Sequence, residues 1–292
     1  MFRGITPHRR PGYAPVTMDW IQITNRPDFA AFAVQCGVPR IMVDLERMGK
    51  LERQGGLGTF ISDHRLPDVG TVRAAAPRAH LIVRINPWHA ASPDEVEQVL
   101  AQGADSLMLP MFEQAAALRA CADAISGRAR LIALLETRGA LDSLEHWADQ
   151  PGLSEIYVGL NDLHRQLGCS FMIEPLADGT VERVARAAHE RDLRFGFGGI
   201  ARLDEGLLPG RVVLGEHLRL GSQSVILSRT FNREMFEDPD SDWRAMYREQ
   251  LRRLGHCEAV LAARSAEEVQ SDHLLACDLI RKAAATLATA RT

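Results

Sequence analysis

Short apolar runs with strand-like composition alternate with helical patterns along most of this chain of 292 residues. This alternation constrains the fold more than any other feature, because strands separated by helices pair in parallel and bury both faces of their sheet. We expect eight strands, near residues 19–23, 40–45, 80–85, 105–109, 131–136, 155–160, 194–198 and 223–228.

Helical periodicity fills the segments between these runs, most clearly at residues 27–37, 92–103, 113–127 and 178–192. A strand–helix unit that repeats in this way is typical of a (β/α)8 TIM barrel. A doubly wound open sheet also alternates strands with helices. Eight strands favour the barrel.

Both ends of the chain lie outside this repeat. Residues 1–17 are rich in Pro, Arg and Gly, and we expect an N-terminal arm there, followed by one barrel domain over residues 18–292. At about residues 240–290, two amphipathic helices form a C-terminal extension. Their apolar face must be buried on a second subunit or on their own barrel, and it includes Leu274, Leu275, Leu279 and Ile280.

Composition excludes several classes of protein. A net charge of −4 gives no basic surface for nucleic acid, and no apolar stretch is long enough to span a membrane. The N-terminus lacks the apolar core of a secretory signal, so we expect a cytoplasmic protein. The five cysteines show no CxxC spacing, and their odd number argues against a disulfide framework.

Two carboxylates, Glu136 and Asp162, each close an apolar run, LIALLET at 131–137 and IYVGLND at 156–162. They are separated by about one strand–helix–strand unit, so on a parallel barrel both project from neighbouring strand ends at the same face. Hard divalent cations such as Mg²⁺ or Mn²⁺ prefer oxygen ligands. The spacing favours a divalent-metal site over a salt-bridged barrel rim.

Other polar side chains follow the remaining strand ends. Asp44 and Glu46 alternate after the second strand and therefore point to the same side. Arg84 ends the third strand and could bind a substrate carboxylate or pair with Asp44. A metal beside an arginine suits a 2-oxo acid, because the metal can polarise the carbonyl and hold the enolate that forms when a neighbouring C–C bond breaks. Further candidates to line the substrate site are Leu109, Pro110, Gly159 and Asn161, the last of which alternatively caps a turn.

Five segments of the chain resemble, in order, the HpcH/HpaI aldolase and citrate lyase β-subunit family of metal-dependent pyruvate aldolases and CoA-ester lyases. They are VDLE at 43–46, VRIN at 83–86, GADSLMLP at 103–110, LLET at 134–137 and VGLNDLHRQLG at 158–168. The resemblance covers about residues 18–230.

The resemblance implies that Glu136 and Asp162 ligate the metal, that Arg84 holds a pyruvyl carboxylate, and that Glu46 lies close to the metal's waters. It also implies a barrel whose last helix is exchanged between subunits of a homo-oligomer, based on dimers and up to a hexamer in size.

The chain departs from this family after the second strand. The pyruvate aldolases carry a histidine directly after the strand-two glutamate, whereas this chain has Arg47. The candidate bases are therefore His64, at the end of the following segment, and a metal-bound water, with His89 as the other histidine; either histidine could instead be a surface or structural side chain. The segment also differs from the CoA-ester lyases. Basic residues that could serve nucleotide phosphates if this loop opens outward are Lys50, Arg53 and Arg65.

Residues 196–201 match the dinucleotide-binding pattern G-x-G-x-x-A, but a lone match is weak. It follows the seventh strand, and Gly206 and Pro209 stand where a helix should run. We interpret it as a Gly-lined strand end where the backbone approaches a ligand or the neighbouring strand.

The sequence thus predicts a class II aldolase that makes or breaks a C–C bond next to a pyruvate-like 2-oxo acid, with an aldehyde as the second substrate. The expected cofactor is Mg²⁺ or Mn²⁺, with Co²⁺ as a further candidate. The alternatives are a CoA-ester lyase of the citramalyl or malyl type, and a barrel that binds a ligand without catalysis.

Overall fold

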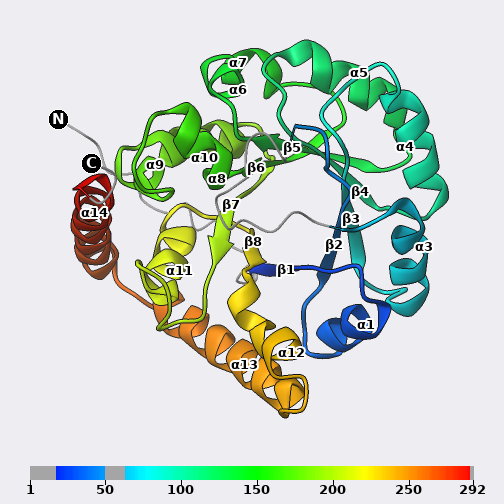
Figure 1. The fold of residues 1–292 in the computed structure, drawn as a ribbon. Coiled ribbons are helices and arrows are strands. Elements are labelled where there is room, and N and C mark those ends of the chain that lie inside the picture. Colours follow the sequence, from blue (N-terminus) through cyan, green and yellow to red (C-terminus); the bar gives the residue numbers. More distant parts are fainter. Residues whose placement is uncertain (1–17, 50–62, 290–292) are drawn as a thin grey trace.

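The computed structural model describes residues 18–49 and 63–289, which form a closed barrel of eight parallel strands surrounded by helices (Figure 1). The (β/α)8 barrel and all eight predicted strands are confirmed. Each strand pairs with its neighbours in sequence, and the last pairs with the first. The strands are β1 (Asp19–Ile23), β2 (Arg40–Asp44), β3 (His80–Arg84), β4 (Ser106–Leu109), β5 (Arg130–Leu135), β6 (Leu153–Val158), β7 (Arg194–Ile200) and β8 (Ser224–Leu227).

Helices follow the strands along the chain and cover the outside of the barrel. The four predicted helices appear as α1, α4, α5 and α10. The helices are α1 (Pro27–Gln35), α3 (Leu66–Ala75), α4 (Ser92–Ala101), α5 (Ala115–Ile125), α6 (Arg138–Asp142), α7 (Leu144–Trp147), α8 (Leu160–Gln166), α9 (Glu174–Ala177), α10 (Thr180–Glu190), α11 (Gly210–Arg219), the 3-10 helix η1 (Arg229–Phe231), α12 (Arg233–Glu237), α13 (Trp243–Ala262) and α14 (Ala266–Thr289).

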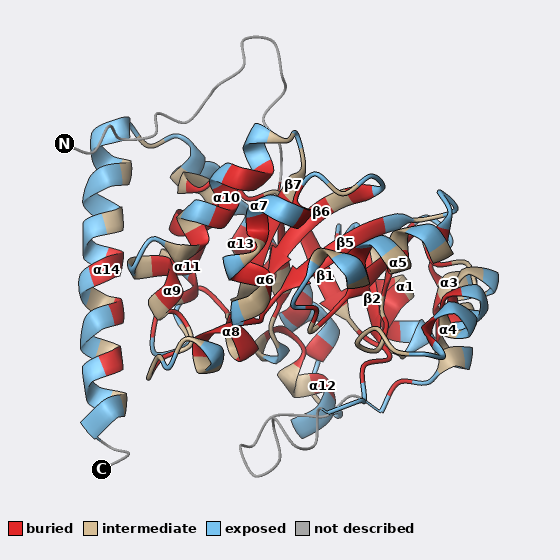
Figure 2. Cartoon of the chain, turned by 90° about the horizontal axis from the view of Figure 1, so that it is seen from above, coloured by how far each residue is buried: buried red, intermediate tan, exposed pale blue. Residues whose placement is uncertain are grey.

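Strand residues alternate between a large core under the helices and a small apolar layer inside the barrel. Figure 2 shows this burial, with the strands and the helix faces that touch them in red. The inner layer consists of Ile21, Met42, Ile82, Met108, Ile132, Leu134 and Tyr157. Because the period is two, the next inward positions along β2 and β3 after Met42 and Ile82 are Asp44 and Arg84.

A buried ion pair lies inside the barrel near the starts of the strands. Arg40 Nη1 and Nη2 donate to the two carboxylate oxygens of Glu155 at 3.0 and 2.7 Å. Ser224 Oγ donates to Glu155 Oε1 at 2.6 Å. Burial alone would raise the pKa of Glu155, but the Arg40 guanidinium and the Ser224 hydroxyl outweigh it and hold the pKa below its ordinary value.

The glycines at the seventh strand are explained by close packing between strands. A Cβ on Gly196 would lie 2.6 Å from the carbonyl oxygen of Ser224 on β8 and 2.7 Å from the ring of Tyr157. Only glycine fits there. This agrees with the interpretation of residues 196–201 as a tight strand end beside a neighbouring strand.

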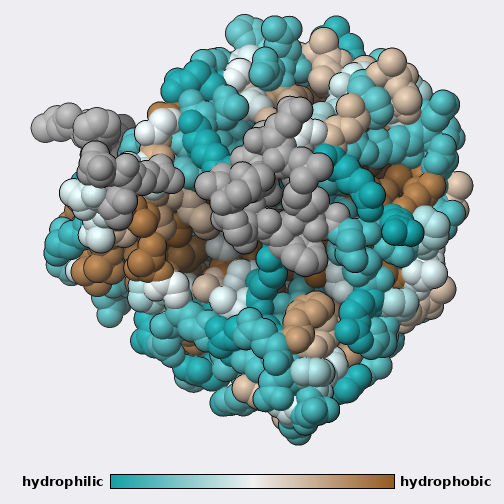
Figure 3. All heavy atoms as spheres, in the orientation of Figure 1, coloured by the Kyte–Doolittle hydropathy of each residue, from teal (hydrophilic) through white to brown (hydrophobic). Residues whose placement is uncertain are grey.

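The two C-terminal helices pack partly on their own barrel. Tyr247 on α13 packs edge-on against Phe29 of α1, and its hydroxyl donates to Gln22 Oε1 at 3.0 Å. α14 lies along α11 and α9 and buries Ile280 there. Leu274 and Leu275, however, remain 61% and 53% exposed, and hydrophobic residues gather in this region of the surface (Figure 3).

The expected N-terminal arm at residues 1–17 lies outside the described residues. All five cysteines are free thiols. In the two described segments, no helix combines the length and the apolar character that a membrane span requires.

Candidate active site

Glu136 directly follows β5 at the end of the barrel where the strands terminate, and its side chain is buried. The backbone N–H of Met111, just after β4, donates to Glu136 Oε1 at 3.1 Å. Met111 has a left-handed backbone with φ of 52°, which is uncommon for a residue with a side chain. Such strained backbone concentrates at functional sites. Here it turns an N–H toward a predicted metal ligand.

Gly159 directly follows β6 and is hydrogen-bonded to the end of β5. Its N–H donates to the carbonyl of Leu135 at 2.9 Å, and a Cβ at this position would lie 2.6 Å from Glu136 Oε2. The missing side chain therefore leaves the space that the Glu136 carboxylate occupies. After Gly159 the chain turns into α8, which carries the buried Asp162 in its first turn. The Arg165 guanidinium lies 3.9 Å from Asp162.

Arg84 is held by two carboxylates of the second strand end. Its Nε and Nη2 donate to the two oxygens of Asp44, each at 2.8 Å. Its Nη1 lies 3.4 Å from Glu46 Oε2. A guanidinium has five N–H groups, so the Asp44 pair leaves donors on Nη1 and Nη2. The predicted pairing of Arg84 with Asp44 and its predicted role toward a substrate are thus compatible.

The charges at this end of the barrel favour a bound cation. Burial raises the pKa of Glu136 above its ordinary value, and the nearby carboxylates of Glu46 and Asp162 raise it further. Arg84 and the Met111 N–H act in the opposite direction but do not outweigh these effects. Without a further positive group, Glu136 therefore keeps its proton up to a pKa of about 8, and a bound cation would favour its ionised form.

Oxygen donors of this kind suit a hard divalent cation. Across residues 18–49 and 63–289, no group of three or more His, Cys, Asp or Glu side chains is arranged to hold a metal ion. A cation at Glu136 and Asp162 would accordingly take its remaining ligands from water and substrate, as Mg²⁺ commonly does.

The predicted base, His64, is buried behind the end of β2. Its Nδ1 accepts the backbone N–H of Asp44 at 2.9 Å. A neutral imidazole with this acceptor carries its hydrogen on Nε2. While the bond to Asp44 is kept, His64 can donate a hydrogen bond through Nε2 but cannot accept a proton at either nitrogen. The other candidate, His89, lies 2.7 Å from Ser92 Oγ at the start of α4.

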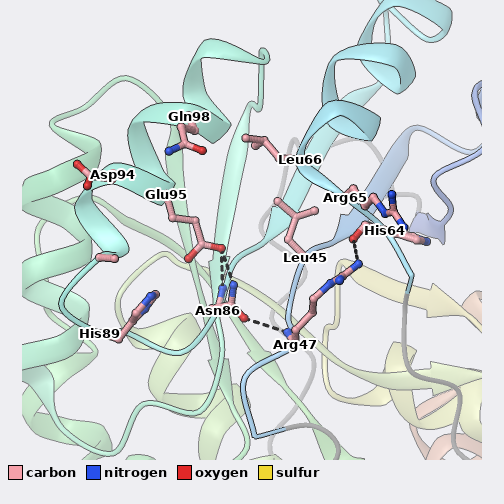
Figure 4. Close-up of a pocket in the computed structure, with 11 residues that line it drawn as sticks. Leu45, Arg47, His64, Arg65, Leu66, Asn86, His89, Asp94, Glu95 and Gln98 are labelled. Atoms are coloured by element: carbon pink, nitrogen blue, oxygen red, sulfur yellow. Dashed lines mark hydrogen bonds between the residues drawn. The ribbon is translucent and has the colours of Figure 1, made fainter.

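A cavity of about 530 Å³ lies beside this site, between the ends of β2 and β3 and the helices α3 and α4 (Figure 4). It contains His64, Arg47 and His89 but none of the carboxylates around Arg84. It therefore lies outside the barrel wall and separate from the acidic cluster. Of the basic residues considered for CoA, Arg65 lines this cavity, whereas Lys50 and Arg53 lie outside the described residues.

The structure separates some of the predicted substrate-binding residues from the cluster. The side chain of Leu109 is fully buried in the core under the helices, so only its backbone can face the barrel mouth. Pro110 is buried just beyond β4, and Asn161 is partly buried next to Asp162 in α8. No structural role was predicted for Asn86, which proves to link the second and third strand ends; its signals in the sequence were its place in the VRIN segment at 83–86 and before Pro87.

Comparisons with known proteins agree with this architecture. A family model described as HpcH/HpaI aldolase/citrate lyase matches residues 21–187. No curated protein sequence matches the chain. An HpcH/HpaI aldolase from Desulfitobacterium hafniense DCB-2 has 16% identity and a TM-score of 0.60, over 77% of this chain and 92% of that one.

Two further solved structures share the fold. An HpcH/HpaI aldolase/citrate lyase family protein from Burkholderia cenocepacia J2315 has 15% identity and a TM-score of 0.58, over 76% of this chain and 94% of that one. The citrate lyase β subunit from M. tuberculosis, complexed with oxaloacetate and magnesium, has 19% identity and a TM-score of 0.54, over 80% and 97% of the two chains.

Proposed function

Because the chain belongs to the HpcH/HpaI aldolase/citrate lyase family, a family of lyases, we propose that it is a metal-dependent aldolase acting next to a pyruvate-like 2-oxo acid. The observation that supports this most directly is the buried carboxyl group of Glu136 beside Asp162 and Arg84, whose raised pKa a bound cation would lower. A divalent cation and an anionic substrate would complete this arrangement.

Arg84 orients the substrate in this proposal. Asp44 fixes the guanidinium through two hydrogen bonds of 2.8 Å, so the remaining donors are held in one direction at little cost in side-chain freedom. These donors bind the carboxylate of the 2-oxo acid. Asp44 is in turn positioned by His64 through the backbone bond at 2.9 Å.

Glu136 and Asp162 would hold the cation, which when bound supplies positive charge that polarises the keto oxygen of the substrate. The M. tuberculosis citrate lyase β subunit was solved with oxaloacetate, a 2-oxo acid, together with magnesium. That pairing supports the same combination here. Mg²⁺ is the first candidate, and Mn²⁺ and Co²⁺ are alternatives because their ligand preferences overlap.

Glu46 is the group that we assign to proton transfer. Its carboxylate lies 3.4 Å from Arg84, and so beside the substrate that Arg84 would hold. In the cleavage direction it takes the proton of the 4-hydroxyl group, the C3–C4 bond breaks, and an aldehyde leaves. The electron pair remains on the pyruvate enolate, which then takes a proton at C3 to give pyruvate.

A second candidate is a CoA-ester lyase of the citramalyl or malyl type. The open cavity of about 530 Å³ favours it, because Arg47 and Arg65 there could bind the phosphates of a nucleotide. We also propose a homo-oligomer built from dimers, since α14 leaves Leu274 and Leu275 exposed.

Deuterium exchange into the methyl group of pyruvate, followed by NMR, tests the aldolase proposal without knowledge of the aldehyde. We expect exchange that requires Mn²⁺ or Mg²⁺ and is lost in Glu136→Ala. Glu190→Ala, which removes an exposed carboxylate on α10, is the matched control and should keep the wild-type rate. Metal without protein sets the background. The proposal would be contradicted if no exchange occurred with Mg²⁺, with Mn²⁺ or with Co²⁺. CoA esters would then be assayed to test the second candidate.

A further inference from the structure

Asn86 links three elements at the edge of the candidate site. It follows β3 by two residues, and its Oδ1 accepts the backbone N–H groups of Arg47 at 2.9 Å and Met48 at 3.1 Å. Its Nδ2 donates to Glu95 Oε1 on α4 at 2.8 Å. Figure 4 shows the side chain between the turn after β2 and α4. One amide thereby ties that turn to β3 and to the outer helix layer.

Glu95 determines which way the Asn86 amide faces. Glu95 Oε1 accepts both the side-chain Nδ2 and the backbone N–H of Asn86, the latter at 3.2 Å. An amide with its nitrogen toward this carboxylate must turn its oxygen toward the two N–H groups of the turn. Among the described residues, none bonds to Glu95 Oε2, although this oxygen is buried. Glu95 thus uses one carboxylate oxygen to hold Asn86 while its other oxygen is buried without a hydrogen bond within the described part of the chain.

The turn that Asn86 holds begins at Glu46. On the N-terminal side, the Leu45 N–H donates to the Arg84 carbonyl at 2.8 Å and the Glu46 N–H donates to Asp44 Oδ1 at 3.2 Å. On the C-terminal side, the next two N–H groups are both bound by Asn86. Every backbone N–H from residue 45 to residue 48 is therefore fixed, and the position of the Glu46 carboxylate near Arg84 depends on Asn86 for half of these bonds.

We infer that Asn86 is a positioning residue for Glu46, and that Glu95 acts with it by fixing the orientation of its amide. This inference rests on the proposed function, which gives Glu46 the proton-transfer role. Both ends of the Asn86 amide are bound by the turn and by Glu95, so we assign it no contact with the reacting groups. Its effect should accordingly appear in the rate of proton transfer rather than in binding of the metal, whose proposed ligands lie just after β5 and on α8.

The pair permits an exchange of partners as a test. Asn86→Asp keeps an acceptor for the turn but places a carboxylate against Glu95, so repulsion should displace the turn. Glu95→Gln in the same chain restores a donor to the contact. The double variant should therefore recover activity that Asn86→Asp loses. Such a recovery would not occur if Asn86→Asp lost its activity through general unfolding. Asp94→Asn, an exposed neighbour on α4, is the control.

We would measure kcat and KM for pyruvate deuterium exchange, with Mn²⁺ affinity determined by electron paramagnetic resonance. For Asn86→Asp we expect kcat to fall by about tenfold or more while KM and Mn²⁺ affinity change by less than about threefold, because only the placement of Glu46 is lost. The double variant should regain at least about threefold in kcat. The inference would be overturned if Asn86→Asp kept the wild-type kcat, or if the kcat of the double variant were no higher than that of Asn86→Asp.

Amide hydrogen exchange separates this inference from the proposed function. If the wild-type protein shows no pyruvate exchange, the proposed function fails, but protection of the Arg47 and Met48 amides can still be measured. Asn86→Asp should then lose that protection and the double variant should regain it. Unchanged protection in Asn86→Asp would refute the positioning role independently of any reaction.

Discussion

Replacement of Gly159 by alanine should damage the candidate metal site and destabilise the protein together. The added Cβ would lie 2.6 Å from Glu136 Oε2, 2.9 Å from Glu136 Cβ and 3.2 Å from Leu134 Cδ1. The backbone of Gly159 has φ of −84°, which alanine adopts readily, so the effect arises from contact and not from backbone strain. The buried Glu136 carboxylate must move to accommodate the methyl group.

Forcing one methyl group into a packed site costs about 1–3 kcal/mol. In a large domain each kcal/mol lowers Tm by about 2–4 °C, so Gly159→Ala should lower Tm by roughly 2–12 °C. Displacement of Glu136 should also weaken Mn²⁺ binding and abolish most metal-dependent exchange of pyruvate. The assays are thermal unfolding by circular dichroism, Mn²⁺ titration, and exchange by NMR.

Gly255→Ala provides the opposite control. Gly255 lies within α13, and a Cβ there meets nothing within 4 Å. Alanine in a helix interior is favoured over glycine by about 0.8–1 kcal/mol, so this variant should be slightly more stable and fully active. If Gly159→Ala keeps wild-type Tm and Mn²⁺ affinity, the close packing of Gly159 against Glu136 does not position the carboxylate, and the reasoning fails.

Two further predictions concern pH and assembly. Burial lowers the pKa of His217 to about 3, so between the ordinary value of 6.5 and about 3 the unfolded chain binds a proton that the folded chain does not. Through this residue, the free energy of unfolding should therefore decrease by about 2 kcal/mol from pH 7 to pH 5. Urea unfolding of His217→Gln should lack that part of the decrease. An identical pH dependence of the wild-type protein and the variant would count against this role of His217. For assembly, Leu274→Glu combined with Leu275→Glu should lower the molar mass measured by light scattering to that of a monomer, and an unchanged oligomer would show that this surface of α14 lies outside the interface.

The strands could be predicted from the sequence because each is a short apolar run, but their ends could not always be placed. The sixth strand was expected at residues 155–160 and spans Leu153–Val158. The apolar run continues through Gly159 into Leu160, the first residue of α8. Composition does not separate a buried strand from the buried first turn of the helix that follows it.

Residues of the candidate site were predictable where strand alternation alone decides the direction of a side chain. Asp44 and Glu46 point to the same side as expected, and both face Arg84. The same alternation, applied to the fourth strand, would have directed Leu109 away from the barrel, since Met108 lies inside it. The prediction of Leu109 as a substrate-site residue rests instead on its place at the end of the strand.

The hydrogen bonds that complete the site join segments far apart in sequence, so no local pattern contains them. The bond from the Asp44 N–H to His64 Nδ1 spans 20 positions, and the bond from the Arg47 N–H to Asn86 Oδ1 spans 39. The first decides what protonation chemistry His64 can perform. Both follow from the distances between loops, which are set by how α3 and α4 pack on the barrel.

The apolar layer inside the barrel separates two groups of charges with different consequences for protein engineering. Charges above it, around Arg84 and Glu136, are those that the proposed function uses, whereas the Arg40–Glu155 pair lies on its other side, among the strand starts. Replacing a buried ion pair by apolar residues of similar volume is often neutral or stabilising. The end of the barrel where the strands start is therefore the place to raise thermal stability, because substitutions there leave the charges around Arg84 and Glu136 untouched.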